Sequence, residues 1–250
     1  MLRAYGDGNL FGEAYGDGPI RVVFLHGWAR RGRDFAVCAS ELAERGVASV
    51  ALDLPGFGSS PPPTVAGGAR HYARLLAPAL AQMSPEPVIL VGHSYGGTVA
   101  TVIAANDSHL VSGLVLTGAP LLRPSATSRS RAPWRFRLTR SLHARGMISD
   151  TRMEAARQHY GSSDYRHASG VMRDVLVASV NESYEDELAR VSVPVAMVWG
   201  ELDHDVPEII AKRALTLLQG PHSFRSLKGV GHLVPTEAPQ ELLASTLEML

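Results

Sequence analysis

The feature that most restricts the fold is a set of short apolar runs that alternate along the chain with helix-like segments. The runs are rich in β-branched residues and apolar on both faces, like strands of a parallel sheet that helices cover on each side. The runs are 21–27, 48–54, 88–93, 110–119 and 195–200. The segments between them, such as 65–83 and 96–105, are rich in Ala and Leu at helical spacing. This alternation predicts an α/β protein with a doubly wound, mostly parallel sheet.

Both ends of the chain extend this pattern. Ala-Tyr-Gly-Asp-Gly occurs at 4–8 and again at 14–18, with a short apolar stretch between the copies. Because Gly-Asp-Gly is a turn signal, the two copies predict an antiparallel hairpin at the sheet edge. Toward the C-terminus we expect a helix that begins near Pro207, a strand at 222–228 and a final helix from Thr236.

One interruption divides the pattern. Between Pro120 and Arg190 there is no strong strand run, and the composition is polar, Arg-rich and helix-like. We therefore expect an α/β core formed by 1–119 and 191–250 and a helical cap insertion at 120–190. Open α/β sheets bind ligands beyond the carboxyl ends of their strands, so the insertion is expected to cover that edge.

Composition excludes several classes of function. The formal net charge is +0, so no overall field favours nucleic acid or an anionic membrane surface. No stretch approaches the roughly 20 consecutive apolar residues of a membrane span. The single cysteine, Cys38, excludes an internal disulfide and fits a reducing compartment. With no apolar run of signal-peptide length among the first residues, we expect a cytoplasmic protein; the oligomeric state is not indicated.

The strongest chemical signal is Gly92-His93-Ser94-Tyr95-Gly96, which follows the apolar run Val-Ile-Leu-Val and opens a helix-like segment. A serine on such a tight turn is held in a strained conformation that projects its hydroxyl, and the flanking glycines avoid collisions across the turn. We predict that Ser94 is a nucleophile and that the amide of Tyr95, at the helix start, is an oxyanion donor. An ordinary tight turn that contains a serine is the weaker interpretation, because the strand and the helix stand where the motif requires them.

A serine hydroxyl is a weak nucleophile unless a base lies beside it. His232 is the candidate base, in a glycine-rich loop between the last expected strand and the final helix. Asp203 follows the run 195–200 and is the candidate acid, since a carboxylate at a strand end can hold the imidazole in the tautomer that accepts the serine proton. Asp205 is the rival, assigned to a helix cap instead, and Glu201 is a third candidate.

Together these blocks resemble the α/β-hydrolase superfamily over nearly the whole chain. The matching blocks are the serine turn, His26-Gly27-Trp28, Asp53-Leu54-Pro55-Gly56-Phe57-Gly58-Ser59, Gly-x-x-Asp-x-x-Val-Pro at 200–207 and Gly231-His232. The resemblance implies the α/β-hydrolase fold with a helical cap insertion, and a triad in the chain order Ser, Asp, His, with the acid at Asp203. It also implies that the amide of Trp28 is the second oxyanion donor and that His26 buttresses its loop and is not the base.

We therefore expect a serine hydrolase that cleaves a carboxylic ester or related acyl bond through an acyl-enzyme, without a cofactor. The chain is also loosely similar to methyl esterases that act on acyl-carrier-protein substrates. Two alternatives stay open: a hydrolase of carbon–carbon bonds in β-diketones or ring-fission products, which uses the same triad, and a ligand-binding or signalling protein on the same fold. No metal site is expected, because His-Glu-x-x-His and other ligand spacings are absent.

A positive patch falls within the expected insertion. From Arg123 to Arg145 there are seven arginines and no Asp or Glu, as the sequence shows. Trp134, Arg135 and Arg137 are the candidate substrate-binding residues, because charge and an aromatic wall meet there. Arginine suits carboxylate and phosphate groups, so the patch predicts a small-molecule acyl substrate that is anionic or carrier-bound. The alternative is a solvated helix face whose arginines pair with acids at the other end of the insertion. Those acids are Glu182, Glu185, Asp186 and Glu187.

Overall fold

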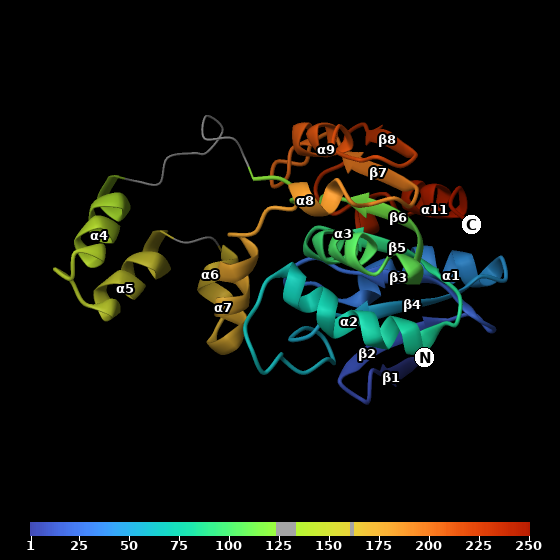
Figure 1. The fold of residues 1–250 in the computed structure, drawn as a ribbon, viewed down its shortest axis with the longest axis horizontal. Helices are drawn as coiled ribbons and strands as arrows, with labels where there is room; N and C mark the ends of the chain where they lie inside the picture. Colours follow the sequence, from blue (N-terminus) through green and yellow to red (C-terminus); the bar gives the residue numbers. More distant parts are fainter. Residues whose placement is uncertain (124–133, 161–162) are drawn as a thin grey trace.

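The computed structural model describes residues 1–123, 134–160 and 163–250, and within them eight strands form one sheet in the order β1-β2-β4-β3-β5-β6-β7-β8 (Figure 1). The strands are β1 (Leu2–Tyr5), β2 (Leu10–Tyr15), β3 (Ile20–Leu25), β4 (Ala48–Asp53), β5 (Val88–His93), β6 (Val111–Thr117), β7 (Val195–Gly200) and β8 (His222–Leu227). Strands β3 to β8 are parallel, whereas β2 is antiparallel to both β1 and β4. The predicted mostly parallel sheet is confirmed.

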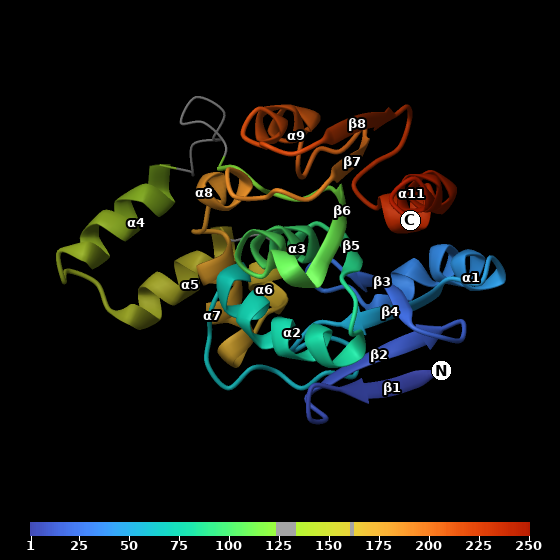
Figure 2. The same cartoon turned by 45° about the vertical axis from the view of Figure 1, so that its right-hand side comes forward.

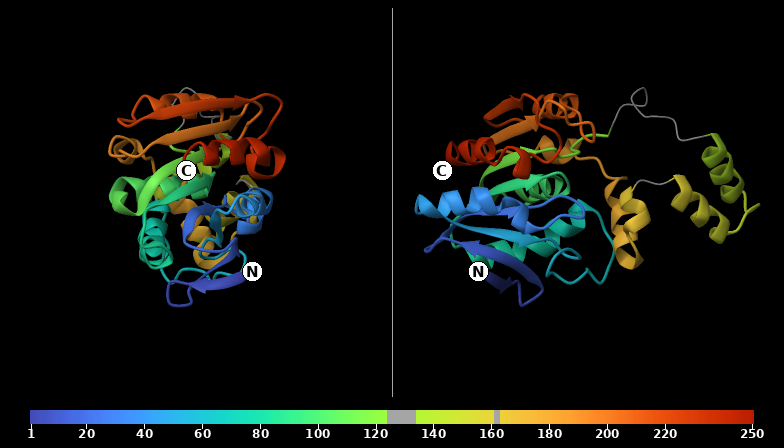
Figure 3. Two further views of the ribbon diagram at one scale, coloured as in Figure 1. Left: turned by 90° about the vertical axis from the view of Figure 1, so that its right-hand side faces the viewer. Right: turned by 180° about the vertical axis from the view of Figure 1, so that it is seen from behind.

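Helices cover both faces of the sheet (Figure 3). On one face, α1 (Ala36–Glu44), preceded by a 3-10 turn (Gly32–Phe35), packs with α11 (Pro239–Leu247) over an apolar cluster that includes Phe24 and Val198. On the other face, α2 (Ala69–Met83), α3 (Tyr95–Asn106) and α9 (Glu208–Leu215) cover a larger cluster that includes Leu90 and Trp199. The sheet is therefore doubly wound, as its two-sided apolar strands predict.

The N-terminal hairpin also forms where the repeated pentapeptide predicts it. Strands β1 and β2 pair antiparallel at the sheet edge, with Tyr5 opposite Leu10. The turn between them has positive φ at Gly6 (55°), Asp7 (56°) and Gly8 (84°). Glycine and aspartate tolerate this left-handed region, which explains why Gly-Asp-Gly can close the turn.

Two predicted helix boundaries are wrong, each for a local reason. The helix expected at 65–83 begins only at Ala69, because Gly68 is extended and lies against the Glu182 carboxylate, 2.3 Å from where a Cβ would stand. The final helix expected from Thr236 is divided into α10 (Val234–Glu237) and α11. Pro239 lacks an N–H and disfavours helical backbone in the residue before it, so the chain breaks there.

Every regular element in the described part of the stretch between β6 and β7 is a helix. Its helices are α4 (Trp134–Ala144), α5 (Asp150–Tyr160), α6 (Ser163–His167), α7 (Gly170–Ser179) and α8 (Glu185–Leu188). Helices α4 and α5 pack on each other and stand away from the sheet, whereas α6 and α7 lie closer to it (Figures 1 and 2). Of the described helices of the segment, α6 and α7 therefore lie nearer the carboxyl edge than α4 and α5 do. Across the described ranges, every helix falls short of the length or the apolar character that a bilayer-spanning helix needs.

An ion pair between half-exposed Arg70 and buried Glu187 fastens α8 to the core. Arg70 on α2 donates from Nε and Nη2 to the two carboxylate oxygens of Glu187, at 2.6 and 2.9 Å, and Nη2 also reaches the carbonyl of Ser183 at 2.8 Å. The side chain of Glu187 is only 5% exposed. Burial would raise its pKa, but the hydrogen bonds from Arg70 and the charges of Arg70 and Arg190 outweigh burial and lower it. Glu187, one of the four acids that the solvated-face alternative named, thus pairs with arginines outside the segment 123–145.

We predict that Arg70→Met lowers the free energy of unfolding by about 2 kcal/mol, because it leaves the buried Glu187 carboxylate without its partner. Arg74→Met is the matched control: Arg74 lies on the same helix and is exposed, so its loss should cost less than about 0.5 kcal/mol. Urea denaturation followed by circular dichroism measures both. Equal stabilities for the two variants would show that the ion pair contributes nothing net.

Candidate active site

The serine turn connects β5 to α3 with a backbone that only close packing maintains. Ser94 has φ +50° and ψ −118°, a conformation that L-residues seldom adopt. A Cβ on Gly96 would lie 2.1 Å from the Leu25 carbonyl oxygen, and one on Gly92 would lie 2.5 Å from the Cα of Gly97. Both positions therefore require glycine. The turn predicted from Gly-x-Ser-x-Gly is formed, and Ser94 is half-buried at its apex.

Hydrogen bonds to the neighbouring strands hold this turn in place. The amide of Ser94 donates to the carbonyl of Thr117, at the end of β6, at 2.8 Å. The amide of Gly96 donates to the carbonyl of His26, just beyond β3, at 3.0 Å. Ser94 is thus fixed from both sides by the strands that flank β5 in the sheet.

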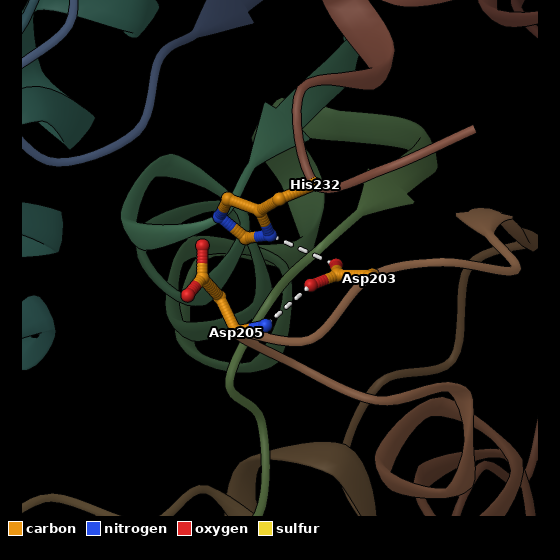
Figure 4. A group of neighbouring side chains, drawn as sticks. All are labelled: Asp203, Asp205 and His232. Atoms are coloured by element: carbon orange, nitrogen blue, oxygen red, sulfur yellow. Dashed lines mark hydrogen bonds and ion pairs between the residues drawn. The ribbon is translucent and has the colours of Figure 1, made fainter.

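An acid–base pair lies on the loops after β7 and β8 (Figure 4). His232 Nδ1 and Asp203 Oδ2 are 2.8 Å apart, and Asp203 Oδ1 accepts the amides of Asp205 at 3.0 Å and Val206 at 2.8 Å. The Asp203 side chain is 1% exposed and that of His232 18%. An acceptor at Nδ1 fixes the tautomer with its proton there, so Nε2 is left as the proton acceptor. Asp203, not Asp205, makes this contact.

Two residues that the sequence analysis did not single out hold His232 against the serine turn and the end of β6. His93, the residue before Ser94, donates from Nε2 to the His232 carbonyl at 2.9 Å. Gly118 follows the strand end to which the Ser94 amide is bonded, and a Cβ there would lie 2.8 Å from His232 Cε1. Two sequence signals could have identified them. His93 occupies the variable position before the serine of the motif, and Gly118 directly follows an apolar strand.

Further hydrogen bonds join the loops that carry the acid and the base. Leu202 donates its amide to the Val230 carbonyl at 2.8 Å. Glu237 on α10 accepts the amide of Gly231 at 2.6 Å. Glu201, the third candidate acid, accepts the amide of Gly229 at 3.2 Å and so braces the base loop.

Burial and charge shift the pKa of both histidines at this site. Burial would lower the pKa of His232, but its hydrogen bond to Asp203 and the charges of Asp203, Asp205 and Glu237 outweigh burial and raise it. Burial, reinforced by the charge of His232, lowers the pKa of His93 to about 3. His93 is therefore neutral at physiological pH, with its proton on Nε2, whereas the environment of His232 favours its protonated form.

Two backbone amides, one in the loop after β3 and one at the start of α3, lie beside the serine turn without an acceptor among the described residues. His26 is buried; its Nε2 accepts the Leu54 amide at 2.9 Å, and its Nδ1 lies 2.7 Å from the Gly27 carbonyl oxygen. His26 thus braces the loop and is not available as a base. Among the described residues, the amides of Trp28 and Tyr95 donate to no acceptor. The ring of Trp28 packs edge-on against Tyr95, with centroids 5.8 Å apart.

A cavity of about 330 Å³ opens beside Ser94 between the sheet edge and α7. Its lining comprises Trp28, Ser94, Tyr95, Thr98, Pro120, Leu122, Arg123, Asp164, Leu176, Ser179, Val180, Glu182, Tyr184 and Asp205. A second cleft of about 460 Å³ shares Trp28 and Asp164 with it. The walls are largely apolar or aromatic, with charge at a few points, as in sites for small organic ligands.

The structure does not bring the predicted substrate-binding arginine to this cavity. Arg137 is exposed on α4, which packs against α5 and contributes no described residue to the lining. The side chains of Trp134 and Arg135 lie outside the described residues. Among the described arginines of the segment 123–145, Arg123 alone lines the cavity.

The acid–base pair also belongs to a set of possible metal donors. One atom each of Asp203, Asp205 and His232 lies within 4.8 Å of the others. His232 Nδ1 and Asp203 Oδ2 already bond each other, and Asp203 Oδ1 accepts two amides. These hydrogen bonds explain why the three side chains lie close together: Asp203 and His232 bond each other, and the Asp205 amide bonds Asp203.

Comparison with known proteins gives one family and several relatives. The sequence profile of a family described as "Alpha/beta hydrolase family" matches residues 22–246. Lipase LipV of Mycobacterium tuberculosis is 31% identical over 94% of this chain and 95% of its own length. A pimeloyl-[acyl-carrier protein] methyl ester esterase of Vibrio cholerae is 29% identical over 81% of this chain and 83% of its own.

Two further matches concern a longer relative and a solved structure. The chain covers only 43% of the biotin biosynthesis bifunctional protein BioHC of Teredinibacter turnerae, to which it is 26% identical over 88% of its own length. The solved structure of an esterase from Exiguobacterium antarcticum superposes with a TM-score of 0.75, covering 99% of this chain and 98% of that one at 19% identity. This second likeness shows the fold.

We predict that Gly118→Ala lowers kcat at least about 100-fold, since the new Cβ would collide with His232 and displace it, and displacements of about 1 Å are enough for such a loss. Gly146→Ala is the control: Gly146 also has positive φ (+70°), but nothing lies within 4 Å of its Cβ position. Steady-state kinetics and thermal unfolding of both variants separate loss of activity from backbone strain. Similar activity in the two variants would contradict the role assigned to Gly118.

The raised pKa of His232 predicts the pH dependence. The protonated imidazole cannot accept a proton, so kcat/KM should increase with pH and reach half its maximum above about 6.5, the ordinary histidine value. In Asp203→Asn the residual activity should have a lower midpoint, because the strongest influence that raises this pKa is gone. A profile that stays flat from pH 5 to 8, with chemistry limiting the rate, would exclude a histidine base.

Proposed function

The chain belongs to the alpha/beta hydrolase family, and on that premise we propose that it is a serine hydrolase that cleaves a carboxylic ester through an acyl-enzyme. The observation that carries this proposal is the buried Asp203–His232 pair, at 2.8 Å, whose loop is hydrogen-bonded to the residue beside Ser94. A binding protein on the same fold would need no histidine with a fixed tautomer next to a strained serine.

In the proposed mechanism His232 Nε2 accepts the proton of Ser94 while Oγ attacks the ester carbonyl carbon. The carbon–oxygen bond of the ester then breaks, and His232 returns the proton to the departing alcohol. Water, deprotonated by the same nitrogen, attacks the acyl-enzyme and releases the acid, which restores Ser94. Asp203 stays ionised and stabilises the imidazolium at each transfer.

The amides of Trp28 and Tyr95 supply the second part of the mechanism. The Trp28 amide follows Gly27 and the Tyr95 amide follows Ser94. Neither amide has an acceptor among the described residues. A negative charge that develops on the carbonyl oxygen is stabilised by such preorganised donors, each worth about 3–4 kcal/mol in related sites. We assign both amides to the oxyanion hole.

The relatives support an ester as the substrate. They include a lipase and a pimeloyl-[acyl-carrier protein] methyl ester esterase. The expectation of an anionic or carrier-bound acyl group stays a prediction for the arginines of α4, which would then hold the carrier end of the substrate away from Ser94. A panel of p-nitrophenyl esters with short to long acyl chains would show which acyl group is cleaved.

We predict that Ser94→Ala reduces turnover of p-nitrophenyl butyrate to background while the thermal midpoint stays close to that of the native protein. Removal of the attacking oxygen abolishes the acyl-enzyme but not the fold. A fluorophosphonate probe should label the native protein at Ser94 alone, as peptide mass spectrometry would show. Labelling at another residue, or an acyl intermediate in Ser94→Ala, would contradict the assignment.

We also predict that Asp203→Asn lowers kcat about 10⁴-fold, because an amide favours the wrong imidazole tautomer. Asp205→Asn is the matched change two residues away, and with an uncharged ester it should cost less than about tenfold, as expected for an exposed charge. Steady-state kinetics of both variants decides between the two acids. The reverse ranking would move the acid to Asp205.

A further inference from the structure

We propose that the Asp205 carboxylate makes the cavity beside Ser94 selective for esters with an uncharged acyl group and repels the carboxylate that their hydrolysis releases. This inference rests on the proposed function and names the class of substrate that the site accepts. It concerns a side chain that the catalytic steps above do not use.

Asp205 stands where substrate and base meet. It lines the same cavity as Ser94 and Trp28. Its carboxylate is turned toward the imidazole of His232 (Figure 4), and the donor atoms of Asp203, Asp205 and His232 lie within 4.8 Å of one another. The amide of Asp205 is bonded to Asp203 Oδ1 at 3.0 Å, so the same hydrogen bond that holds the acid also holds the backbone that carries this second carboxylate.

The other charged groups of the cavity do not cancel this charge near Ser94. Glu182 accepts the hydroxyl of Tyr184 at 2.9 Å and the amide of Arg70 at 3.4 Å, at the start of α2. Asp164 on α6 adds a further carboxylate to the lining. Arg123 is the one guanidinium among the described lining residues, and like Asp164 and Asp205 it is exposed. The cavity therefore carries more carboxylates than cations.

Ester hydrolysis changes the charge of what the cavity holds. Water adds, the acyl carbon–oxygen bond breaks, the alcohol leaves with one proton, and the acid loses its proton to solvent at neutral pH. An uncharged ester thus becomes an anion within a few ångströms of Asp205. Two like charges about 5 Å apart repel each other even in water, so the product dissociates more readily than the substrate, and an acyl group that already bears a carboxylate binds poorly.

Butyrate and butyramide test this directly, because they have the same shape and differ in charge. Binding of each is followed by the indole N–H resonance of Trp28 in a nuclear magnetic resonance titration, which needs no turnover. In the native protein butyrate should bind more weakly than butyramide. In Asp205→Asn the dissociation constant of butyrate should fall about three- to tenfold, the effect of one partly screened charge, while that of butyramide stays the same.

Two further variants serve as controls. Asp205→Glu keeps the charge and should keep the discrimination. Asp174→Asn removes an exposed carboxylate from α7 that does not line the cavity, and should leave both dissociation constants unchanged. Equal binding of butyrate and butyramide by the native protein, or an unchanged butyrate constant in Asp205→Asn, would overturn the inference.

The proposed function fails separately from this inference. Failure of p-nitrophenyl esters to turn over, together with no fluorophosphonate labelling of Ser94, would remove the serine hydrolase mechanism even if butyrate were repelled. Normal ester turnover with no charge discrimination would remove only the role of Asp205. Competitive inhibition of ester turnover by butyrate, stronger in Asp205→Asn than in the native protein, would support both.

Discussion

The left-handed backbone of Ser94 is the constraint on which the rest of the site depends. Such a conformation costs about 1–3 kcal/mol and persists only where the surroundings determine it fully. Here the surroundings are the carbonyl groups of Leu25 and His26 beyond β3, the Thr117 carbonyl at the end of β6, and the first turn of α3. Since these strands flank β5, the order of the sheet itself places the serine at its carboxyl edge.

The same edge explains how the base reaches the serine. Strands β7 and β8 continue the parallel sheet beyond β6, so the loops that carry Asp203 and His232 leave it on the same side as Ser94. Glycines allow these loops to pass close to each other. A Cβ on Gly200 would lie 2.0 Å from the Gly231 carbonyl oxygen, and the missing side chain of Gly118 leaves room for the His232 imidazole. Close backbone packing at these glycines lets the two loops approach each other, and the hydrogen bond of 2.8 Å between Asp203 and His232 joins them.

The arginines of α4 and the carboxylates of the cavity beside Ser94 lie in two separate regions of the molecule. The arginines of α4 stand on a helix pair that extends away from the sheet, whereas the cavity beside Ser94 is lined by Asp205, Asp164 and Glu182. A substrate with an uncharged ester at one end and an anionic carrier at the other fits such a separation. A short anionic acyl group does not, because its charge would lie among the carboxylates.

The sequence by itself determined the two-sided strands, the serine turn and the chain order of the candidate triad, because periodicity and turn chemistry are local properties. It could not choose between Asp203 and Asp205 with the same force, since both follow β7 and the choice depends on where that loop bends. The contacts of His93 and Gly118 with His232 join residues more than a hundred positions apart, and only the sheet order brings them together. Nor could composition place α4: its arginines indicated a cover for the site, but composition does not say which helices of the segment pack near the sheet, and α4 packs on α5 instead.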